Sequence, residues 1–208
     1  EDGIENKKVS QLSDGNRTKL MLAGVLARET EMLVLDEPAS PLDPVMREKL
    51  CALICDYLNE KEGERTVLFS THNIADMERI TDYVIIMGYD EHYAGSDEGS
   101  VASIGFVNQG IEDTLKEVPA EQVILAAPLY TRVWALTPKD AGEDVEAASE
   151  DYVPYELSSQ AVGMQEAWNM VSANGVEPTW SDEDGQYYAE YVNDGVTYKI
   201  WLEDTRSL

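Results

Sequence analysis

The stretch MLVLDEP at residues 32–38 decides the fold of the first part of the chain. Its four apolar residues lack polar alternation, which is typical of a strand buried on both faces. Similar apolar runs at 66–70 and 83–87 predict two further strands. Helical patterns alternate with these strands, at about 16–28, 45–60 and 74–81. This order predicts an α/β fold with a parallel sheet and covering helices.

Polar residues follow two of these strands at the carboxyl end, where ligands bind in open parallel sheets. Asp36 and Glu37 directly follow the first strand, and the segment 70–72 (STH) follows the second. Of two adjacent carboxylates, one can hold Mg²⁺ while the other activates a nucleophile. The sequence therefore predicts a metal-and-water site at this edge, and Ser13 is placed to cap the helix before the first strand.

Four segments resemble, in order and spacing, the ATP-binding domain of ABC transporters over about residues 1–86. They match the signature loop at 12–16 (LSDGN), the Walker B strand at 33–38, the D-loop at 40–44 (SPLDP) and the switch histidine at 70–72. The resemblance implies that Asp36 binds Mg²⁺ through water. It also implies that Glu37 polarises the attacking water and that His72 contacts the γ-phosphate.

The same resemblance implies that Ser13 and Gly15 offer backbone donors to the ATP of a dimer partner. Asp43 would serve the dimer interface, and a transporter membrane subunit would be a further partner. Asp14 departs from the family pattern and brings negative charge near phosphate. The chain has no GxxxxGK[S/T] loop (Walker A), which would supply a lysine and a nest of N–H groups. We therefore expect Mg-ATP to bind only if a Walker A is supplied.

A second set of signals fills residues 83–208. Helices are predicted at about 107–117 and 164–173, and strands at about 122–127, 186–192 and 196–202, with a hairpin turn at 193–195 (NDG). Residues 137–158 are acidic and are predicted to form a loop. Aromatic and charged residues close the strands, as in Tyr89-Asp90, Tyr130 with Arg132, and Trp201 with Glu203. Flat apolar rings beside carboxylates are typical of a sugar site.

Three segments resemble family-18 glycoside hydrolases, the chitinase-like barrels, and in particular the branch that acts on spores and peptidoglycan. Residues 87–93 (MGYDEHY), 128–134 (PLYTRVW) and 198–204 (YKIWLED) match the sixth, seventh and eighth barrel strands. Residues 135–197 resemble the small α+β insertion of that family. The resemblance covers about residues 80–208.

This second resemblance implies that Tyr89 and Asp90 position the N-acetyl group of a bound sugar. Tyr130 and Arg132 would line the cleft, and Trp201 would form the floor under the reacting ring. Cleavage also requires a carboxylic acid that protonates the leaving oxygen. The D-x-x-D-x-D-x-E motif that carries this acid does not occur in the chain, so we expect no glycosidase activity.

The two resemblances overlap at residues 82–87, and we divide the chain there into 1–82 and 83–208. The fold expected is a partial P-loop-type sheet of parallel βα units running into a partial TIM-type barrel with a small α+β insertion. On one hypothesis, the first part stands in for missing barrel strands. Net charge changes across the division, from 17 acidic and 10 basic residues to 24 acidic and 5 basic.

Three functions remain open for such a catalytically incomplete fusion. It could bind an N-acetylglucosamine-type glycan, act as an ABC ATPase fragment within a longer chain, or be a rearranged or designed chimera without function. The net charge of -26 argues against nucleic acid as a partner. Cys51 and Cys55 are interpreted as core residues, and no apolar run is long enough to span a membrane. The lack of a leader favours the cytoplasm, although the chain starts with Glu and its start is expected to be truncated.

Overall fold

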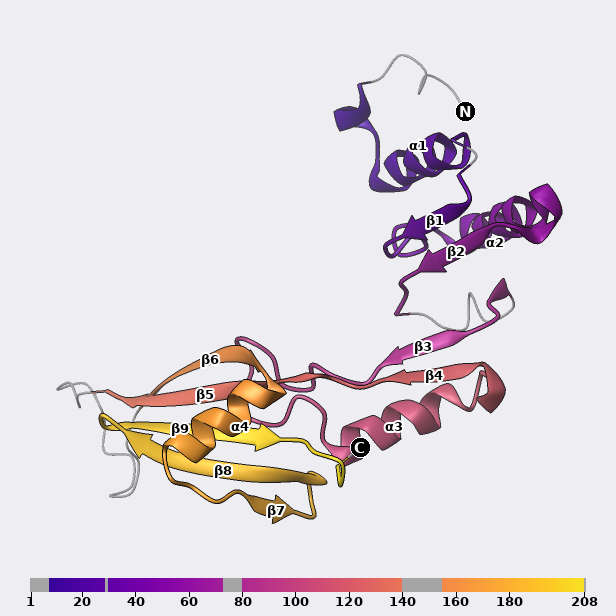
Figure 1. Ribbon diagram of the computed structural model, residues 1–208. Coiled ribbons are helices and arrows are strands. Elements are labelled where there is room, and N and C mark those ends of the chain that lie inside the picture. The colour runs from indigo at the N-terminus through magenta and orange to yellow at the C-terminus, as the bar shows by residue number, and fades with distance from the viewer. Residues whose placement is uncertain (1–7, 29, 73–79, 140–154, 208) are drawn as a thin grey trace. The chain divides into compact units, whose positions relative to one another are not determined.

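The computed structural model describes residues 8–28, 30–72, 80–139 and 155–207 (Figure 1). The chain forms two compact units, a first unit of Glu1–Val84 and a second unit of Ile85–Leu208. Within the described residues, no helix is both long and apolar enough to cross a membrane.

The first unit alternates helices with two short strands. Its elements are η1 (Val9–Gln11), α1 (Asp14–Leu26), β1 (Met32–Leu35), α2 (Pro44–Asn59), η2 (Glu60–Gly63) and β2 (Thr66–Phe69). The strands β1 and β2 pair in parallel, with Leu35 opposite Phe69 at the carboxyl end. The predicted strands and the two helices agree with these bounds to within two residues. The helix expected at 74–81 falls largely outside the described residues.

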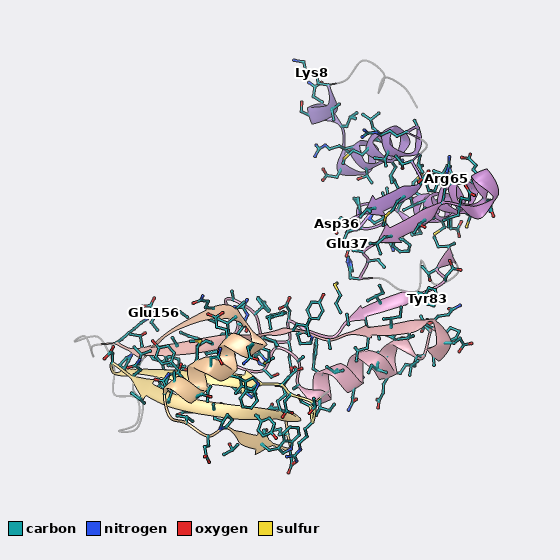
Figure 2. The ribbon with its side chains drawn as sticks, in the orientation of Figure 1. Lys8, Asp36, Glu37, Arg65, Tyr83 and Glu156 are labelled. Atoms are coloured by element: carbon teal, nitrogen blue, oxygen red, sulfur yellow. The ribbon has the colours of Figure 1, made fainter. Side chains whose placement is uncertain are left out.

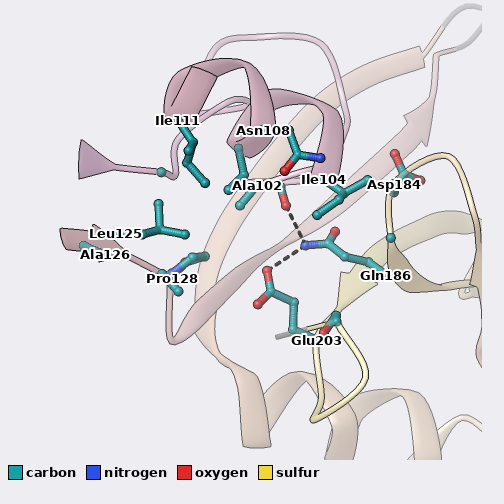
Figure 3. Close-up of a pocket in the computed structure, with 15 residues that line it drawn as sticks. Ala102, Ile104, Asn108, Ile111, Leu125, Ala126, Pro128, Asp184, Gln186 and Glu203 are labelled. Atoms are coloured by element: carbon teal, nitrogen blue, oxygen red, sulfur yellow. Dashed lines mark hydrogen bonds between the residues drawn. The ribbon is translucent and has the colours of Figure 1, made fainter. Parts of the chain in front are cut away.

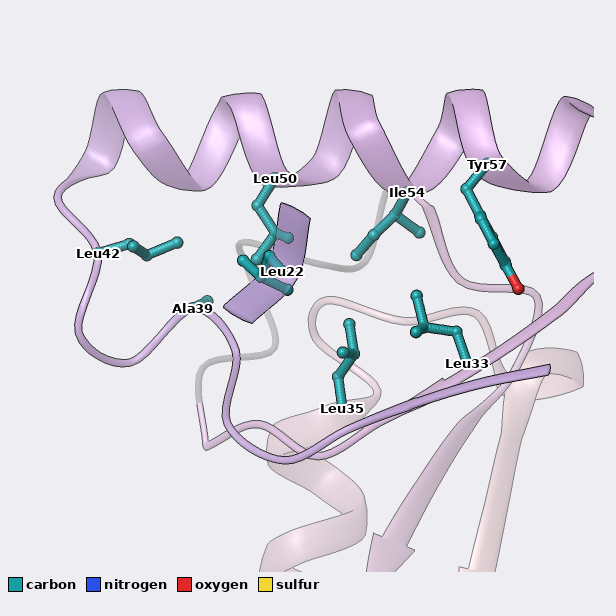
Figure 4. Close-up of a cluster of buried hydrophobic side chains, with 8 residues drawn as sticks. All are labelled: Leu22, Leu33, Leu35, Ala39, Leu42, Leu50, Ile54 and Tyr57. Carbon is teal, nitrogen blue, oxygen red and sulfur yellow. The ribbon is translucent and has the colours of Figure 1, made fainter. Parts of the chain in front are cut away.

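One face of the β1–β2 pair carries the core of the first unit. Leu33 and Leu35 point toward α2, where Leu50, Ile54 and Tyr57 are buried (Figure 4). The alternate side chains of β1 lie on the other face, and Met32 and Val34 are 53% and 65% exposed. The prediction of strands buried on both faces was therefore wrong for β1. Because side chains alternate along a strand, helices on one face bury only every second residue.

The division between the units falls within β3 (Val84–Met87), and the second unit continues with the helix α3 (Ile104–Thr114) and the strand that pairs with β3. The helix α3 is followed by η5 (Ala120–Gln122) and β4 (Val123–Ala126). The hydrogen-bonded partner of β3 is β4, and both arrows run in the same direction in Figure 1. The three strands predicted to share one sheet are therefore divided, since β1 and β2 form a separate pair.

A five-stranded antiparallel sheet forms the rest of the second unit, in the order β6-β5-β9-β8-β7. Its elements are β5 (Tyr130–Pro138), β6 (Tyr155–Gly163), α4 (Met164–Ala173), β7 (Thr179–Ser181), β8 (Gln186–Asn193) and β9 (Val196–Leu202). The helix α4 packs on one face, over a core that includes Val133, Ala189 and Ile200. Asp194 and Gly195 have φ of 49° and 77°, as the predicted β8–β9 hairpin turn requires.

The sheet corrects two expectations. Segments 128–134 and 198–204, predicted as the seventh and eighth strands of a parallel barrel, lie on the neighbouring antiparallel strands β5 and β9. Their register places Val133 opposite Ile200. The loop predicted at 137–158 is wrong at both of its ends, because residues 137–138 belong to β5 and residues 155–158 belong to β6, and its middle part, 140–154, lies outside the described residues. The α+β character expected for 135–197 thus extends over the whole of β5 to β9.

Candidate functional site

Asp36 and Glu37 lie at the end of β1, as Figure 2 shows, beside the end of β2. The Ser70 hydroxyl donates to Asp36 Oδ1 at 2.6 Å and accepts from the Glu37 N–H at 2.9 Å. Parallel pairing places both carboxyl ends at one edge, so these contacts join the two predicted polar segments. The predicted proximity of residues 36–38 (the DEP corner) to residues 70–72 (the STH segment) is therefore present in the structure.

His72 completes this corner. Its Nδ1 lies 3.0 Å from Glu37 Oε1, and its side chain is 75% exposed. Glu37 has a φ of 44°, a left-handed conformation that is uncommon outside glycine. The Asp36 carboxylate and the Ser70 hydroxyl place oxygen atoms together at this edge, and oxygen atoms are the ligands that Mg²⁺ prefers. Among the residues described, no group of three or more His, Cys, Asp or Glu side chains is arranged to hold a metal ion.

Two of the other residues of the nucleotide prediction act locally as helix caps. Ser13 is the N-cap of α1, and its hydroxyl accepts from the Asn16 N–H at 3.4 Å. Asp43 is the N-cap of α2, and its Oδ1 accepts from the Met46 N–H at 3.0 Å. A Cβ at Gly15 would lie 3.4 Å from the Pro41 carbonyl oxygen, so the LSDGN loop approaches the SPLDP segment. The capping predicted for Ser13 is confirmed.

Tyr89, Asp90 and Tyr130 form one cluster in the second unit. The Tyr130 hydroxyl donates to Asp90 Oδ1, and the rings of Tyr89 and Tyr130 meet edge to face at 6.3 Å. Burial, together with the hydrogen bond to Asp90, raises the pKa of Tyr130 to about 12. The hydroxyl is therefore a neutral donor at ordinary pH. Asp90 has a φ of 64°, which turns the chain sharply after β3.

Arg132 and Trp201 project from the same face of the sheet as Tyr130. Their neighbours Val133 and Ile200 belong to the core on the α4 side, and side chains alternate along a strand. Arg132 Nη1 donates to Ser159 Oγ at 2.9 Å, while its Nε has no hydrogen-bond partner within the part of the chain that is described. Of the five residues predicted for the sugar site, Tyr89, Asp90 and Tyr130 thus form one contacting cluster. The other two, Arg132 and Trp201, lie on the same sheet face as Tyr130.

The structure adds residues that sequence reasoning did not select. Trp201 Nε1 donates to Asp184 Oδ2 at 2.9 Å, and its ring lies 5.0 Å from that of Tyr188. The Thr131 hydroxyl donates to the Trp201 carbonyl at 2.6 Å. Only the alternation of β8 and β9 across their hairpin could have indicated that Tyr188 is the neighbour of Trp201. The contact with Asp184 has no sequence signal.

A cavity of about 250 Å³ also lies in the second unit, between α3, the end of β4 and the start of β8. Ile104, Ile111 and Leu125 form an apolar wall, and the Glu203 carboxylate points into the space (Figure 3). Glu203 is 8% exposed, and burial raises the pKa of its carboxyl group. The Gln186 amide donates to Glu203 Oε1 at 2.6 Å and to the Ala102 carbonyl at 3.0 Å. This network joins the segment before α3 to the residues that follow β9.

Comparison with known protein sequences gives two kinds of relative, and no protein-family model matches the chain. The ATP-binding protein EcfA2 of an energy-coupling factor transporter of Clostridioides difficile is 29% identical over 161 residues, which are 77% of this chain and 50% of that protein. YdhD of Bacillus subtilis, named as a sporulation-specific glycosylase, is 31% identical over 130 residues, which are 62% of this chain and 27% of that protein. The chain spans half or less of the length of these curated relatives.

Comparison with solved structures gives glycosylases and chitinases. YdhD of Bacillus subtilis matches with a TM-score of 0.62 and 21% identity, over 93% of this chain and 64% of that one. The spore cortex-lytic enzyme SleL of Bacillus cereus matches with a TM-score of 0.65 and 18% identity, over 92% and 43%. A class V chitinase of Nicotiana tobaccum in complex with NAG4 matches with a TM-score of 0.55 and 15% identity, over 92% and 63%.

The sequence matches and the structural matches support different statements. Because the structural matches have identities of 21%, 18% and 15%, they concern the fold alone. The chain is therefore similar in sequence both to ABC ATPases and to the glycosylase YdhD, and over most of its length it has the fold of chitinase-like spore enzymes of family 18.

Proposed function

We propose that the second unit binds glycans built from N-acetylglucosamine and does not cleave them. The observation that carries this proposal is the cluster of Tyr89, Asp90 and Tyr130 beside a sheet face that bears Arg132 and Trp201. Aromatic rings stack on the apolar faces of sugars, and a carboxylate accepts from hydroxyl and amide groups. Both kinds of group are present here, within one compact unit.

The sequence supports the part of the proposal that excludes cleavage. Hydrolysis needs a carboxylic acid beside the leaving oxygen, and the chain lacks the D-x-x-D-x-D-x-E motif that supplies it in this family. Glu203 is a buried carboxyl group with a raised pKa, but Gln186 occupies one of its oxygens. We assign Glu203 to the cavity network and give it no role at the sugar.

Calorimetric titration with chitotetraose tests the proposal, with cellotetraose as the matched control that lacks N-acetyl groups. We expect saturable binding of chitotetraose at millimolar concentration or below, and at least tenfold weaker binding of cellotetraose. Mass spectrometry should recover the chitotetraose intact. Equal affinity for the two sugars, no saturation up to 10 mM (roughly the limit of a specific site), or release of shorter oligomers would contradict it.

A second function is favoured by the corner of Asp36, Glu37, Ser70 and His72. This geometry supports an ATPase fragment that works with a Walker A loop supplied from elsewhere and with a second ABC subunit as partner. For the chain alone we expect Mg-ATP affinity weaker than about 1 mM, because a phosphate-binding nest is missing. Micromolar Mg-ATP affinity would overturn this expectation. If neither chitotetraose nor Mg-ATP binds, the remaining interpretation is that the chain is a chimera without function.

A further inference from the structure

The turn between β7 and β8 supplies two carboxylates, and each accepts a hydrogen bond from a tryptophan indole. Trp180 Nε1 donates to Asp182 Oδ1 at 2.8 Å. Trp201 Nε1 donates to Asp184 Oδ2 at 2.9 Å. The two pairs are alike in chemistry and in distance, and they come from a single four-residue turn.

The two pairs lie on opposite faces of the sheet. Trp180 packs edge to face on Tyr187 at 5.1 Å, and Tyr187 packs against the core on the α4 side. Trp201 packs on Tyr188 at 5.0 Å. Since Tyr187 and Tyr188 are consecutive on β8, their side chains point to opposite faces. Only the Trp201 pair shares a face with Tyr130.

Asp184 is itself held in place. Its Oδ2 accepts from the Ser181 hydroxyl at 2.8 Å, and its N–H donates to the same hydroxyl at 3.2 Å. Its carbonyl accepts from the Ile104 N–H at the start of α3, at 2.8 Å. Gly185 has a φ of 67°, and a Cβ there would lie 2.9 Å from Ile104. The turn is therefore fixed against α3, and a fixed acceptor fixes the plane of the indole that donates to it.

From this geometry we infer that Asp184 is a positioning residue for Trp201, and that the turn at 182–185 thereby forms part of the glycan site. A flat ring that is ordered before the sugar arrives spares the ordering cost that binding would otherwise carry. This inference deepens the proposed function and rests on it. Asp184 acts through Trp201 and does not touch the sugar.

The test compares three variants by titration with chitotetraose and by the indole N–H signals in a proton–nitrogen NMR spectrum. Asp184→Ala removes the acceptor and should weaken binding about fivefold and shift the Trp201 indole signal. Asp184→Asn keeps an oxygen that can accept from both donors, and it should bind within about twofold of the unchanged protein. Asp182→Ala removes the equivalent bond of Trp180 and should leave the affinity unchanged.

The outcomes separate the two proposals. If the unchanged protein binds and Asp184→Ala binds equally well, the positioning role is wrong while the proposed function stands. If the unchanged protein does not bind, the proposed function has failed. Equal weakening by Asp182→Ala would also overturn the inference, because it would indicate general loosening of the turn. Should Asp184→Ala fail to fold, Ser181→Ala frees the carboxylate without removing it, and an unchanged Trp201 signal there would overturn the inference.

Discussion

The hydroxyl of Tyr130 offers the sharpest single-atom test of the sugar site. Replacing Tyr130 by Phe removes the donor to Asp90 and keeps the ring that meets Tyr89 at 6.3 Å. Asp90 then has no hydroxyl to hold its carboxylate, which follows a left-handed turn of the chain. We expect the carboxylate to become mobile and to bind the sugar's N-acetyl group less well.

The magnitude follows from the kind of bond that is lost. A hydrogen bond to a charged acceptor contributes about 1.5–3 kcal/mol when buried, and a partly exposed one contributes about 1 kcal/mol. If that free energy is needed to hold Asp90 for the ligand, chitotetraose affinity should fall about fivefold. The free energy of unfolding of the second unit should fall by about 1 kcal/mol or less.

Calorimetry measures the affinity, and tryptophan fluorescence measures unfolding of the second unit, which contains all four tryptophans. The matched control is Tyr57→Phe, which removes a hydroxyl that donates to the Thr30 carbonyl in the first unit. That change should leave sugar affinity as it is. If Tyr130→Phe binds chitotetraose within twofold of the unchanged protein, roughly the error of such a comparison, the Asp90–Tyr130 pair is not part of the site.

Three further predictions concern the helix cap, the DEP corner and the buried carboxyl group. Asp43→Ala should cost the first unit about 1 kcal/mol and lower its midpoint temperature by about 4–8 °C in circular dichroism, whereas Asp43→Ser should keep the cap; equal loss in both would show that capping is not the reason. Ser70→Ala should lower the free energy of unfolding of the first unit by about 1 kcal/mol in urea, because two hydrogen bonds are lost, while Ser70→Thr retains them; an unchanged midpoint for Ser70→Ala would refute this. Burial raises the pKa of Glu203 in the folded state, so its contribution to stability is full below the ordinary value of 4.5 and is lost as pH rises through the folded pKa. Glu203→Gln should therefore gain stability relative to the unchanged protein between pH 4 and pH 8. If urea unfolding followed by fluorescence shows the same pH dependence of stability for the two proteins, this prediction is wrong.

The sequence predicted elements well where an apolar run is bounded by polar residues. β1 and β9 begin and end as predicted, because their apolar residues are followed at once by charged ones. Two strands that were missed, β6 and β7, lie at the two edges of the sheet, and β6 reads YELSSQAVG. Its strand conformation depends on pairing with β5, and nothing in its own composition indicates this.

Pairing and burial were harder to predict than elements. That β3 pairs with β4, and that β5 and β9 are antiparallel, depends on contacts between residues far apart in the chain. The polar contacts at the candidate sites were also hard to predict where they join residues that share no motif. Asp36, Glu37 and His72 could be grouped because motif order brings them to one edge. Asp184 could not, because its bond to Trp201 spans 17 residues and belongs to no motif.

The most direct test of the sugar-site account is a proton–nitrogen NMR spectrum of the indole N–H groups, recorded while chitotetraose is added. Four signals are expected, and each indole has a different acceptor: Gly99 for Trp134, Glu203 for Trp168, Asp182 for Trp180 and Asp184 for Trp201. Trp134 is buried, and Trp168 and Trp180 pack on Tyr187 on the α4 side. The Trp201 signal should move saturably while the other three stay in place and the sugar remains intact. A Trp201 signal that stays fixed at saturating sugar, or movement of Trp168 and Trp180 in its place, would contradict this expectation.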